Sequence, residues 1–508
     1  MASARSNVLC LLAMVGGLDC YLVYNGRSGG DDAQNPQSFY YLLSRLTVCK
    51  WSLVGFRKKN RAKIGIMLLL AVVLGCGAYG WNEYEEFFEV PTTRLAAGSF
   101  YPEMPSDSHH HYLQIPLDHR NPSLGNFTAF YLLSPGFLAG EDVVFWLFDN
   151  QQERVGMINN SRDFEYFEEI LGGMSYVLMG NRGVTPTLFP EVFNEDGSAN
   201  YSLALRLYGS QQQVDDIEAV RQDMQNKGLL PEDGKIMLYG GSGGGVLIQQ
   251  YLDKYGVHVS RAIIECSGDP DLAYAHNTTF MKRIYLSNES LAKSYFSLMQ
   301  NGDDSASLAF MLYKIGMSGN TDLQNQIANR KRGTFSLESQ SAYLRSWLSP
   351  SCNFPLVRRM LDAPRELEVK VRSYELIGDD LEDYHPASAQ EVCLGYEWIE
   401  VLLADLLKAL EDSEIAITKM QLNRSRYQGE VMIWSGTADQ VFSEQMGQWL
   451  CQSYPHARLA LFNDTHERGR YPDYRREFRR DFFVHGLNSP EVQAHFNDLI
   501  QLNAAEKA

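Results

Sequence analysis

Three residues of the types that catalyse acyl transfer follow one another along the chain. Ser242 lies in the glycine-rich motif Gly240-Gly-Ser-Gly-Gly244, and Asp439 and His466 come after it. A serine hydroxyl is a weak nucleophile that needs a histidine as its base, and the histidine needs a carboxylate to fix its tautomer. These residues therefore predict a Ser242–His466–Asp439 triad that works through an acyl-enzyme, with no metal ion and no organic cofactor.

The glycines around Ser242 indicate a sharp turn between a strand and a helix. Residues 235–239 form a short apolar run, and residues 246–255 have helical spacing. In a G-x-S-x-G turn the serine's neighbours must lack side chains, and the helix N-terminus directs amides at the place where an oxyanion forms. A phosphate loop is the alternative, but its Gly-Lys-Ser/Thr sequence is absent and the dinucleotide G-x-G-x-x-G pattern is matched only loosely.

Asp439 and His466 each come a few residues after a predicted strand, over residues 430–434 and 457–462 respectively. Taken alone, Asp439 is also compatible with a turn or helix cap, and His466 with a surface loop. Their order after Ser242 is the order found in α/β-hydrolases, where each triad member stands at the carboxyl end of a strand. Asp464 is the rival acid, although a carboxylate two residues before the histidine is rarely placed to hold its far ring nitrogen.

The rest of the chain alternates between strands and helices. This alternation predicts an α/β-hydrolase fold with a doubly wound, mostly parallel sheet, its core formed by residues 109–269 and 428–508. Residues 270–427 lack strand-like runs, which predicts a helical cap inserted over the edge of the sheet. The remaining strands are expected over residues 112–117, 127–133, 143–148, 174–179 and 262–266, with helices over residues 211–227 and 443–453 and a final helix over residues 475–485.

The N-terminal region has the sequence pattern of a targeting signal. Residues 64–82 contain no charge, follow a basic cluster and precede an acidic run. This predicts a transmembrane anchor or signal segment, with the catalytic domain membrane-anchored on the non-cytoplasmic side, or secreted or periplasmic. The sequence is compatible with retention, with cleavage, and with lipidation at Cys76. Residues 1–63 are expected to be disordered or absent from the mature protein, and residues 83–108 to be a linker.

Composition limits the partners of the chain. Its 508 residues carry a formal net charge of −17, and no basic stripe occurs outside the N-terminal region, which argues against nucleic acid. The expected partners are a peptide or a small-molecule ester or amide as substrate, and the membrane through residues 64–82. If the protein is exported, a Cys352–Cys393 disulfide is permitted, and buried free thiols are an equal alternative.

Residues from about 112 to 485 resemble the α/β-hydrolase serine exopeptidases of the prolyl aminopeptidase and tripeptidyl aminopeptidase group. Two short stretches, residues 117–119 and 240–242, are also similar to the Pro-Xaa carboxypeptidase group. The resemblance implies an aminopeptidase that releases N-terminal residues from peptides. The matching stretches are Ile115-Pro-Leu-Asp-His-Arg-Asn-Pro122, Gly180-Asn-Arg-Gly183, Tyr239-Gly-Gly-Ser-Gly-Gly244, Arg261-Ala-Ile-Ile264, Ser435-Gly-Thr-Ala-Asp439 and Thr465-His466.

The chain departs from that family after the strand ending at Phe148. A His-Gly-Gly-Pro-Gly-like turn is usual there and helps to form the oxyanion hole, whereas this chain has Asp149-Asn-Gln-Gln-Glu153. We expect the Gly243 N–H as the first oxyanion donor and an amide around Asn150 or Gln151 as the second. The segment Cys393-Leu-Gly-Tyr-Glu397 resembles a cap segment that binds the substrate ammonium group, which makes Glu397 a candidate; a solvated helix glutamate is the alternative.

Two other functions compete with the aminopeptidase hypothesis. A carboxylic-ester hydrolase would use the same triad, but a neutral ester has no ammonium group for cap carboxylates to bind. A catalytically inactive hydrolase fold that serves as a binding protein would be marked by loss of a triad residue. All three triad residues are present, and only the altered turn after Phe148 favours that alternative.

Overall fold

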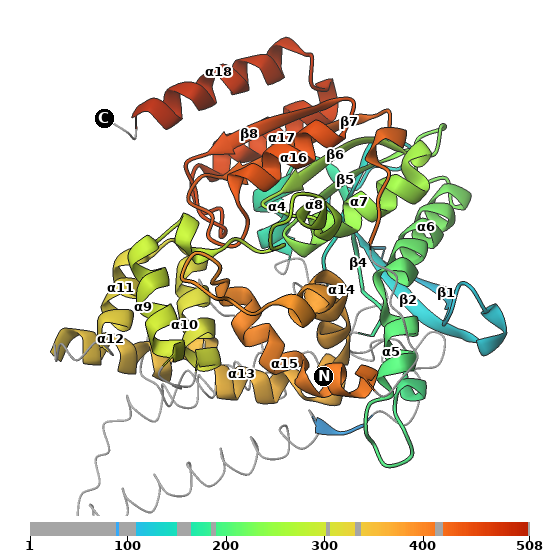
Figure 1. The fold of residues 1–508 in the computed structure, drawn as a ribbon. Helices are drawn as coiled ribbons and strands as arrows, with labels where there is room; N and C mark the ends of the chain where they lie inside the picture. Colours follow the sequence, from blue (N-terminus) through green and yellow to red (C-terminus); the bar gives the residue numbers. More distant parts are fainter. Residues whose placement is uncertain are drawn as a thin grey trace, which may run out of the picture. The chain divides into compact units, whose positions relative to one another are not determined.

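The computed structural model describes residues 88–90, 108–149, 164–183, 189–300, 305–330, 337–411 and 420–505. Within these residues eight strands form one sheet in the order β1-β2-β4-β3-β5-β6-β7-β8 (Figure 1). β2 is antiparallel to both β1 and β4, and the other neighbours are parallel. The strands are β1 (His110–Pro116), β2 (Asn126–Leu133), β3 (Val143–Trp146), β4 (Ser175–Met179), β5 (Ile236–Gly241), β6 (Val259–Glu265), β7 (Glu430–Gly436) and β8 (Ala457–Phe462).

This mostly parallel, doubly wound sheet has the α/β-hydrolase fold, as the sequence predicted. Every residue of β3 and β4 is buried, because strands covered by helices on both faces need apolar side chains on both. β5 lies between β3 and β6. The carboxyl ends of β3, β5, β6, β7 and β8 therefore meet at one edge of the sheet.

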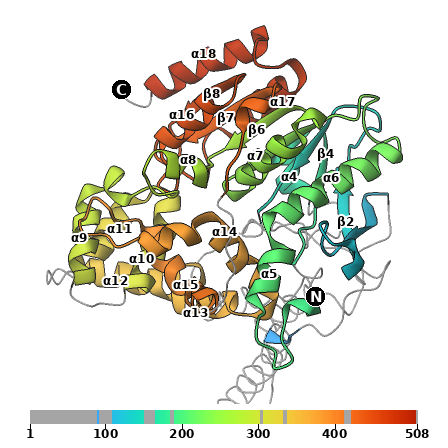
Figure 2. The same ribbon diagram turned by 45° about the vertical axis from the view of Figure 1, so that its right-hand side comes forward.

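Helices cover the sheet on two sides and bury a separate apolar cluster on each. One cluster includes residues of α6 (Ser210–Asn226), α7 (Gly243–Tyr255) and α16 (Glu444–Ser453). The other includes residues of α4 (Glu165–Leu171), α17 (Pro472–His485) and α18 (Pro490–Ala505). Figure 2 shows these layers from a second side. The two layers hold the strands in register and so fix the loops at their ends.

The described residues between β6 and β7 are mainly helical and contribute no strand to the sheet, which confirms the predicted helical cap insertion. All described residues belong to one compact unit, and the cap helices lie together on one side of the sheet edge (Figures 1 and 2). The cap helices are α8 (Pro270–Ala275), α9 (Glu289–Gln300), α10 (Ser305–Met317), α11 (Thr321–Arg330), α12 (Leu337–Leu348), α13 (Phe354–Leu361), α14 (Leu367–Asp383) and α15 (Leu394–Glu411).

The C-terminal part differs from the prediction. Residues 475–485 do not form the last helix, because α18 follows them. Val492 and Leu499 of α18 are buried against the same apolar cluster as Phe478 of α17. The helix is therefore part of the core. The sequence pattern did not predict it, because its few apolar residues stand among polar ones.

The predicted membrane segment, residues 64–82, lies outside the described residues, as do residues 1–63 and most of the predicted linker. Among the helices that the structure describes, none has the length and apolar character needed to cross a bilayer. The anchor or signal segment therefore stays a prediction from the sequence.

Candidate active site

Ser242 stands on the turn from β5 to α7 in a strained backbone conformation. Its φ is 53° and its ψ is −128°, a region that costs a non-glycine residue about 1–3 kcal/mol. Neighbouring groups hold this conformation. The Ser242 N–H donates to Glu265 O at 2.9 Å, and Ser267 Oγ donates to Ser242 O at 2.7 Å. The turn is the strand-to-helix elbow that the glycine spacing predicted.

Two glycines of the motif are required by close contacts. A Cβ atom on Gly240 would lie 2.9 Å from Leu147 O on the neighbouring chain segment. A Cβ atom on Gly243 would lie 1.7 Å from Asp149 Oδ2, so no other residue fits while Asp149 keeps its position. The glycines of the motif therefore make room for the segment at the end of β3 as well as for the turn itself.

Asp439 and His466 form a buried hydrogen-bonded pair. Asp439 lies after β7 and His466 after β8, and His466 Nδ1 is 3.0 Å from Asp439 Oδ2. Asp439 Oδ1 accepts hydrogen bonds from the N–H groups of Val441 at 2.7 Å and Phe442 at 3.1 Å. The side chains of the pair are 2% and 7% exposed, so the carboxylate can hold the imidazole in one orientation away from bulk water.

Ser242 lies at the same edge of the sheet as this pair. Its hydroxyl makes no hydrogen bond, to His466 or to any other residue in the described part of the chain. Catalytic hydrogen bonds are often long without substrate and tighten only in the complex. The structure thus brings Asp439 and His466 into contact and places Ser242 on the adjacent turn, half-buried.

Asp464, the rival acid, is engaged elsewhere. Its carboxylate accepts from Arg475 Nη2 at 2.9 Å, from the Arg470 N–H at 3.0 Å and from the Thr465 N–H at 2.7 Å. These bonds shape the loop that carries His466. Asp464 therefore braces the histidine loop, and Asp439 is the carboxylate on the imidazole.

Arg475 links the histidine loop to the strand next to the elbow. Its second guanidinium nitrogen, Nη1, donates to Glu265 Oε1 at 2.6 Å. Glu265 is fully buried at the end of β6. Burial alone would raise the pKa of Glu265, but Arg479, Arg468 and Arg475 together outweigh it and lower the pKa to about 2. Arg475 thus connects the Ser242 side of the site with the His466 side.

The cap contacts the catalytic loops directly. Lys282 Nζ donates to Asp439 O at 2.7 Å, and burial lowers the pKa of this ammonium group. At the other catalytic loop, the Glu467 N–H donates to Met317 O, at the end of α10, at 3.3 Å. Cap movement would therefore disturb both Asp439 and His466.

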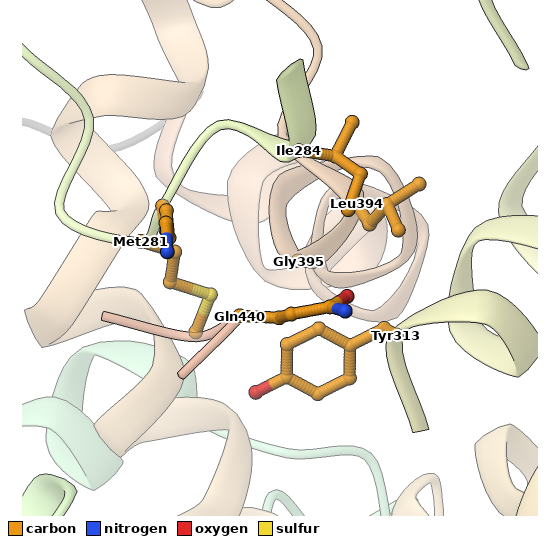
Figure 3. A pocket seen from close by; sticks show the side chains of 7 residues that line it. Met281, Ile284, Tyr313, Leu394, Gly395 and Gln440 are labelled. Atoms are coloured by element: carbon orange, nitrogen blue, oxygen red, sulfur yellow. The ribbon is translucent and has the colours of Figure 1, made fainter. Parts of the chain in front are cut away.

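A pocket lies between the cap and the Asp439 loop (Figure 3). Its cavity volume is about 10 Å³, roughly the room that one water molecule needs. Gln440 and Tyr313 face each other across it. Neither Ser242 nor His466 lines this pocket, so it lies behind the acid and not over the nucleophile. Its lining residues are Met281, Lys282, Ile284, Tyr313, Leu394, Gly395 and Gln440.

The oxyanion candidates are described only in part. Gly243 is the first residue of α7, and its N–H donates to none of the residues that the structure describes, so it is available to an oxyanion. Asn150 and Gln151 lie outside the described residues, and the second donor stays a prediction. Asp149, just before them, is buried, and its Oδ1 accepts from Arg372 Nε at 3.1 Å. Sequence reasoning missed Arg372, because nothing in its spacing connects it to β3.

Glu397 is a buried carboxylate on α15. It is 6% exposed, so the alternative of a solvated helix glutamate is wrong. Its oxygens accept from the hydroxyls of Tyr384 at 2.8 Å and Tyr295 at 3.4 Å, and burial raises the pKa of the carboxyl group. Across the described residues, no Lys, Arg or His side chain pairs with it.

Cys352 and Cys393 are not joined in a disulfide. Cys393 is buried and its Sγ lies 3.7 Å from Met281 O. The structure therefore does not contain the Cys352–Cys393 disulfide that the sequence permits.

Comparison with known proteins gives structural likeness alone. No family model matches the chain, and no curated protein matches its sequence. A solved serine hydrolase from the polyaromatic hydrocarbon-degrading bacterium Cycloclasticus zankles is 9% identical over 74% of this chain and 99% of its own, with a TM-score of 0.37. A probable hydrolytic enzyme from Pseudomonas aeruginosa is 13% identical over 79% and 100%, with a TM-score of 0.35.

An esterase from Exiguobacterium antarcticum is 15% identical, over 70% of this chain and 96% of its own, with a TM-score of 0.32. These identities and TM-scores are low. The similarities therefore assign no activity to this chain, and its function has to be argued from the site.

Proposed function

We propose that this protein is a serine hydrolase that acts through an acyl-enzyme. Ser242 Oγ attacks the substrate carbonyl carbon while His466 Nε2 takes the hydroxyl proton, and the resulting oxyanion lies near the Gly243 N–H. His466 then gives the proton to the leaving group. Water attacks the acyl-enzyme with His466 as base again, and the acid product leaves.

The observation that carries this proposal is the Asp439–His466 pair beside a serine on a strained elbow. A buried carboxylate that accepts from two backbone amides and contacts the imidazole can hold the ring in one orientation and stabilise its charged form during proton transfer. A non-glycine residue at φ 53° on a helix N-terminus is likewise a costly conformation that clusters at functional sites. Both features stand at one edge of the sheet.

Within this class, we propose an aminopeptidase of the proline or tripeptidyl type that acts outside the cytoplasm. The support is the resemblance over residues 112–485, the uncharged segment at residues 64–82 and the buried carboxylate of Glu397 in the cap. A cap over the site would admit short or extended peptides and exclude folded proteins. We take residues 270–427 as the cap and residues 109–269 and 428–508 as the core.

The test compares substrates on the purified full chain and on Ser242→Ala. Free-amine p-nitroanilides of single residues and of tripeptides, their N-acetylated counterparts and p-nitrophenyl esters are assayed in parallel. We expect hydrolysis of free-amine anilides, and a loss on the order of 10⁴-fold or more in Ser242→Ala because the nucleophile is gone. Ser123→Ala, at an exposed turn, is the matched control and should keep full activity.

The other outcomes separate the alternatives. Turnover of esters without turnover of any anilide would favour the carboxylic-ester hydrolase. Turnover that survives Ser242→Ala, or no turnover of any substrate by the wild-type chain, would contradict the proposed hydrolase.

A further inference from the structure

Asp149 places a carboxylate beside the nucleophile, where a glycine-rich turn is usual. It follows β3 and is completely buried. A Cβ atom on Gly243 would lie 1.7 Å from its Oδ2, so this oxygen is in contact with the residue next to Ser242. This oxygen therefore lies beside the turn that carries the nucleophile.

The two oxygens of Asp149 have different partners. Oδ1 accepts from Arg372 Nε at 3.1 Å. Oδ2 is buried and accepts no hydrogen bond from any residue in the described part of the chain. A buried acceptor without a partner is unfavourable and calls for an explanation. A donor supplied by the substrate would satisfy it.

The charges around Asp149 favour a cationic donor. Arg372, on cap helix α14, is fully buried, and its Nη1 also donates to Glu375 Oε2 at 3.2 Å. One guanidinium thus faces two carboxylates, and Glu375 is further held by the Ser210 N–H at 2.8 Å. Burial raises the pKa of Glu375 above its ordinary value. Because Asp149 shares its guanidinium with Glu375, a cation on Asp149 Oδ2 would give Asp149 a partner of its own.

We propose that Asp149 binds the α-ammonium group of the substrate's N-terminal residue, with Arg372 as the positioning residue that keeps Oδ2 turned toward Gly243. This inference rests on the proposed aminopeptidase function and makes it specific. The ammonium nitrogen of a residue is attached to the carbon next to its own carbonyl carbon. A receptor beside Ser242 therefore selects release of a single residue.

Release of a tripeptide would need a different receptor. Its ammonium group lies two residues, or about 7 Å, further from the scissile carbonyl. A carboxylate deeper in the cap, such as Glu397, would suit that geometry, whereas Asp149 would not. Binding of the ammonium group by Asp149 therefore predicts release of single residues, whereas binding by Glu397 predicts release of tripeptides.

A binding experiment tests the proposal without relying on turnover. Calorimetry measures the affinity of the full chain carrying Ser242→Ala for L-prolinamide and L-alaninamide and for their N-acetyl counterparts. Adding Asp149→Asn is expected to raise the Kd of the free-amine amides at least about 30-fold, since a buried charge pair loses one partner. The N-acetyl amides should bind weakly to both proteins.

Kinetics on the otherwise wild-type chain gives the second readout. Asp149→Asn should lower kcat/KM for single-residue anilides mainly through KM, and by a much larger factor than it lowers p-nitrophenyl ester turnover. Asp473→Asn, exposed at the start of α17, is the control that should change neither. If Asp149→Asn does not fold, Asp149→Ser removes the same charge with a smaller side chain.

Results of three kinds, from binding, kinetics and product length, would overturn the proposal. One is equal binding of free-amine amides with and without Asp149→Asn, or no preference of the parent for a free amine. Another is equal loss of ester and anilide turnover in folded Asp149→Asn. The third is release of tripeptides that depends on Glu397 and not on Asp149. Absence of all hydrolysis by the wild-type chain would instead contradict the proposed function, while the binding result would remain readable.

Discussion

Asp439→Asn is expected to lower kcat about 10⁴-fold without unfolding the protein. The asparagine oxygen can still accept from the Val441 and Phe442 N–H groups that now hold Asp439 Oδ1. Its amide nitrogen would then face His466 Nδ1 and donate to it, which forces the ring proton onto Nε2. An imidazole protonated at Nε2 cannot accept the Ser242 proton. Steady-state kinetics and the urea unfolding midpoint measure the two effects.

Asp464→Asn is the matched comparison, because Asp464 is the rival acid two residues before His466. It should lose stability, since Arg475 and two N–H groups lose a charged acceptor. It should keep most of the activity of the folded enzyme. A 10⁴-fold loss in folded Asp464→Asn together with near-normal Asp439→Asn would reverse the assignment of the acid.

Arg475→Met is expected to reduce the free energy of unfolding by about 3–5 kcal/mol, the usual cost of removing one partner of a buried ion pair. Arg475 is 2% exposed and bridges Glu265 and Asp464, which are themselves 0% and 2% exposed. Methionine fills much of the space but leaves Asp464 without its cation. Equilibrium urea unfolding at neutral pH measures the difference.

Arg476→Met is the control on the same helix. Arg476 pairs with Asp473 at 2.8 Å, but the two side chains are 37% and 82% exposed. Such surface pairs contribute about 0–1 kcal/mol. Equal destabilisation by Arg475→Met and Arg476→Met would show that the buried bridge does not hold the histidine loop.

The sequence predicted the parts of the site that depend on local pattern. Ser242 could be placed because glycines mark the sharp turn and the flanking residues show strand and helix periods. Asp439 and His466 could be placed because apolar strands precede them directly. In a parallel sheet the strand ends converge, so local strand predictions were enough to bring distant residues to one edge.

Contacts between segments far apart in sequence could not be predicted in this way. Arg372 meets Asp149 across 223 positions of the chain, and no period or motif connects a cap helix to the end of β3. The burial of Glu397 depends likewise on how α15 packs against Tyr384 and Tyr295. Such contacts follow from tertiary packing of the cap, which the sequence pattern of single helices does not determine.

The sequence showed the family-like motifs at residues 115–122 and 180–183, but it did not show what these motifs do in the structure. Arg182 Nη1 donates to Leu117 O at 2.8 Å, and its Nε donates to Asp216 Oδ2 at 2.6 Å. Asp216 also binds His119 Nε2 at 2.7 Å. The two motifs thus meet in one buried network that joins the end of β1 to α6. We therefore assign them a role in stabilising the fold and not in catalysis.

Covalent labelling of Ser242 tests the central claim most directly. An alkyl fluorophosphonate reacts with a serine only when a base activates it, and mass spectrometry of the digested chain identifies the labelled residue. We predict a single adduct on the peptide that contains Ser242, formed by the native chain, absent from Ser242→Ala and greatly slowed in Asp439→Asn. An adduct on another serine, or none on the folded native chain, would contradict the triad.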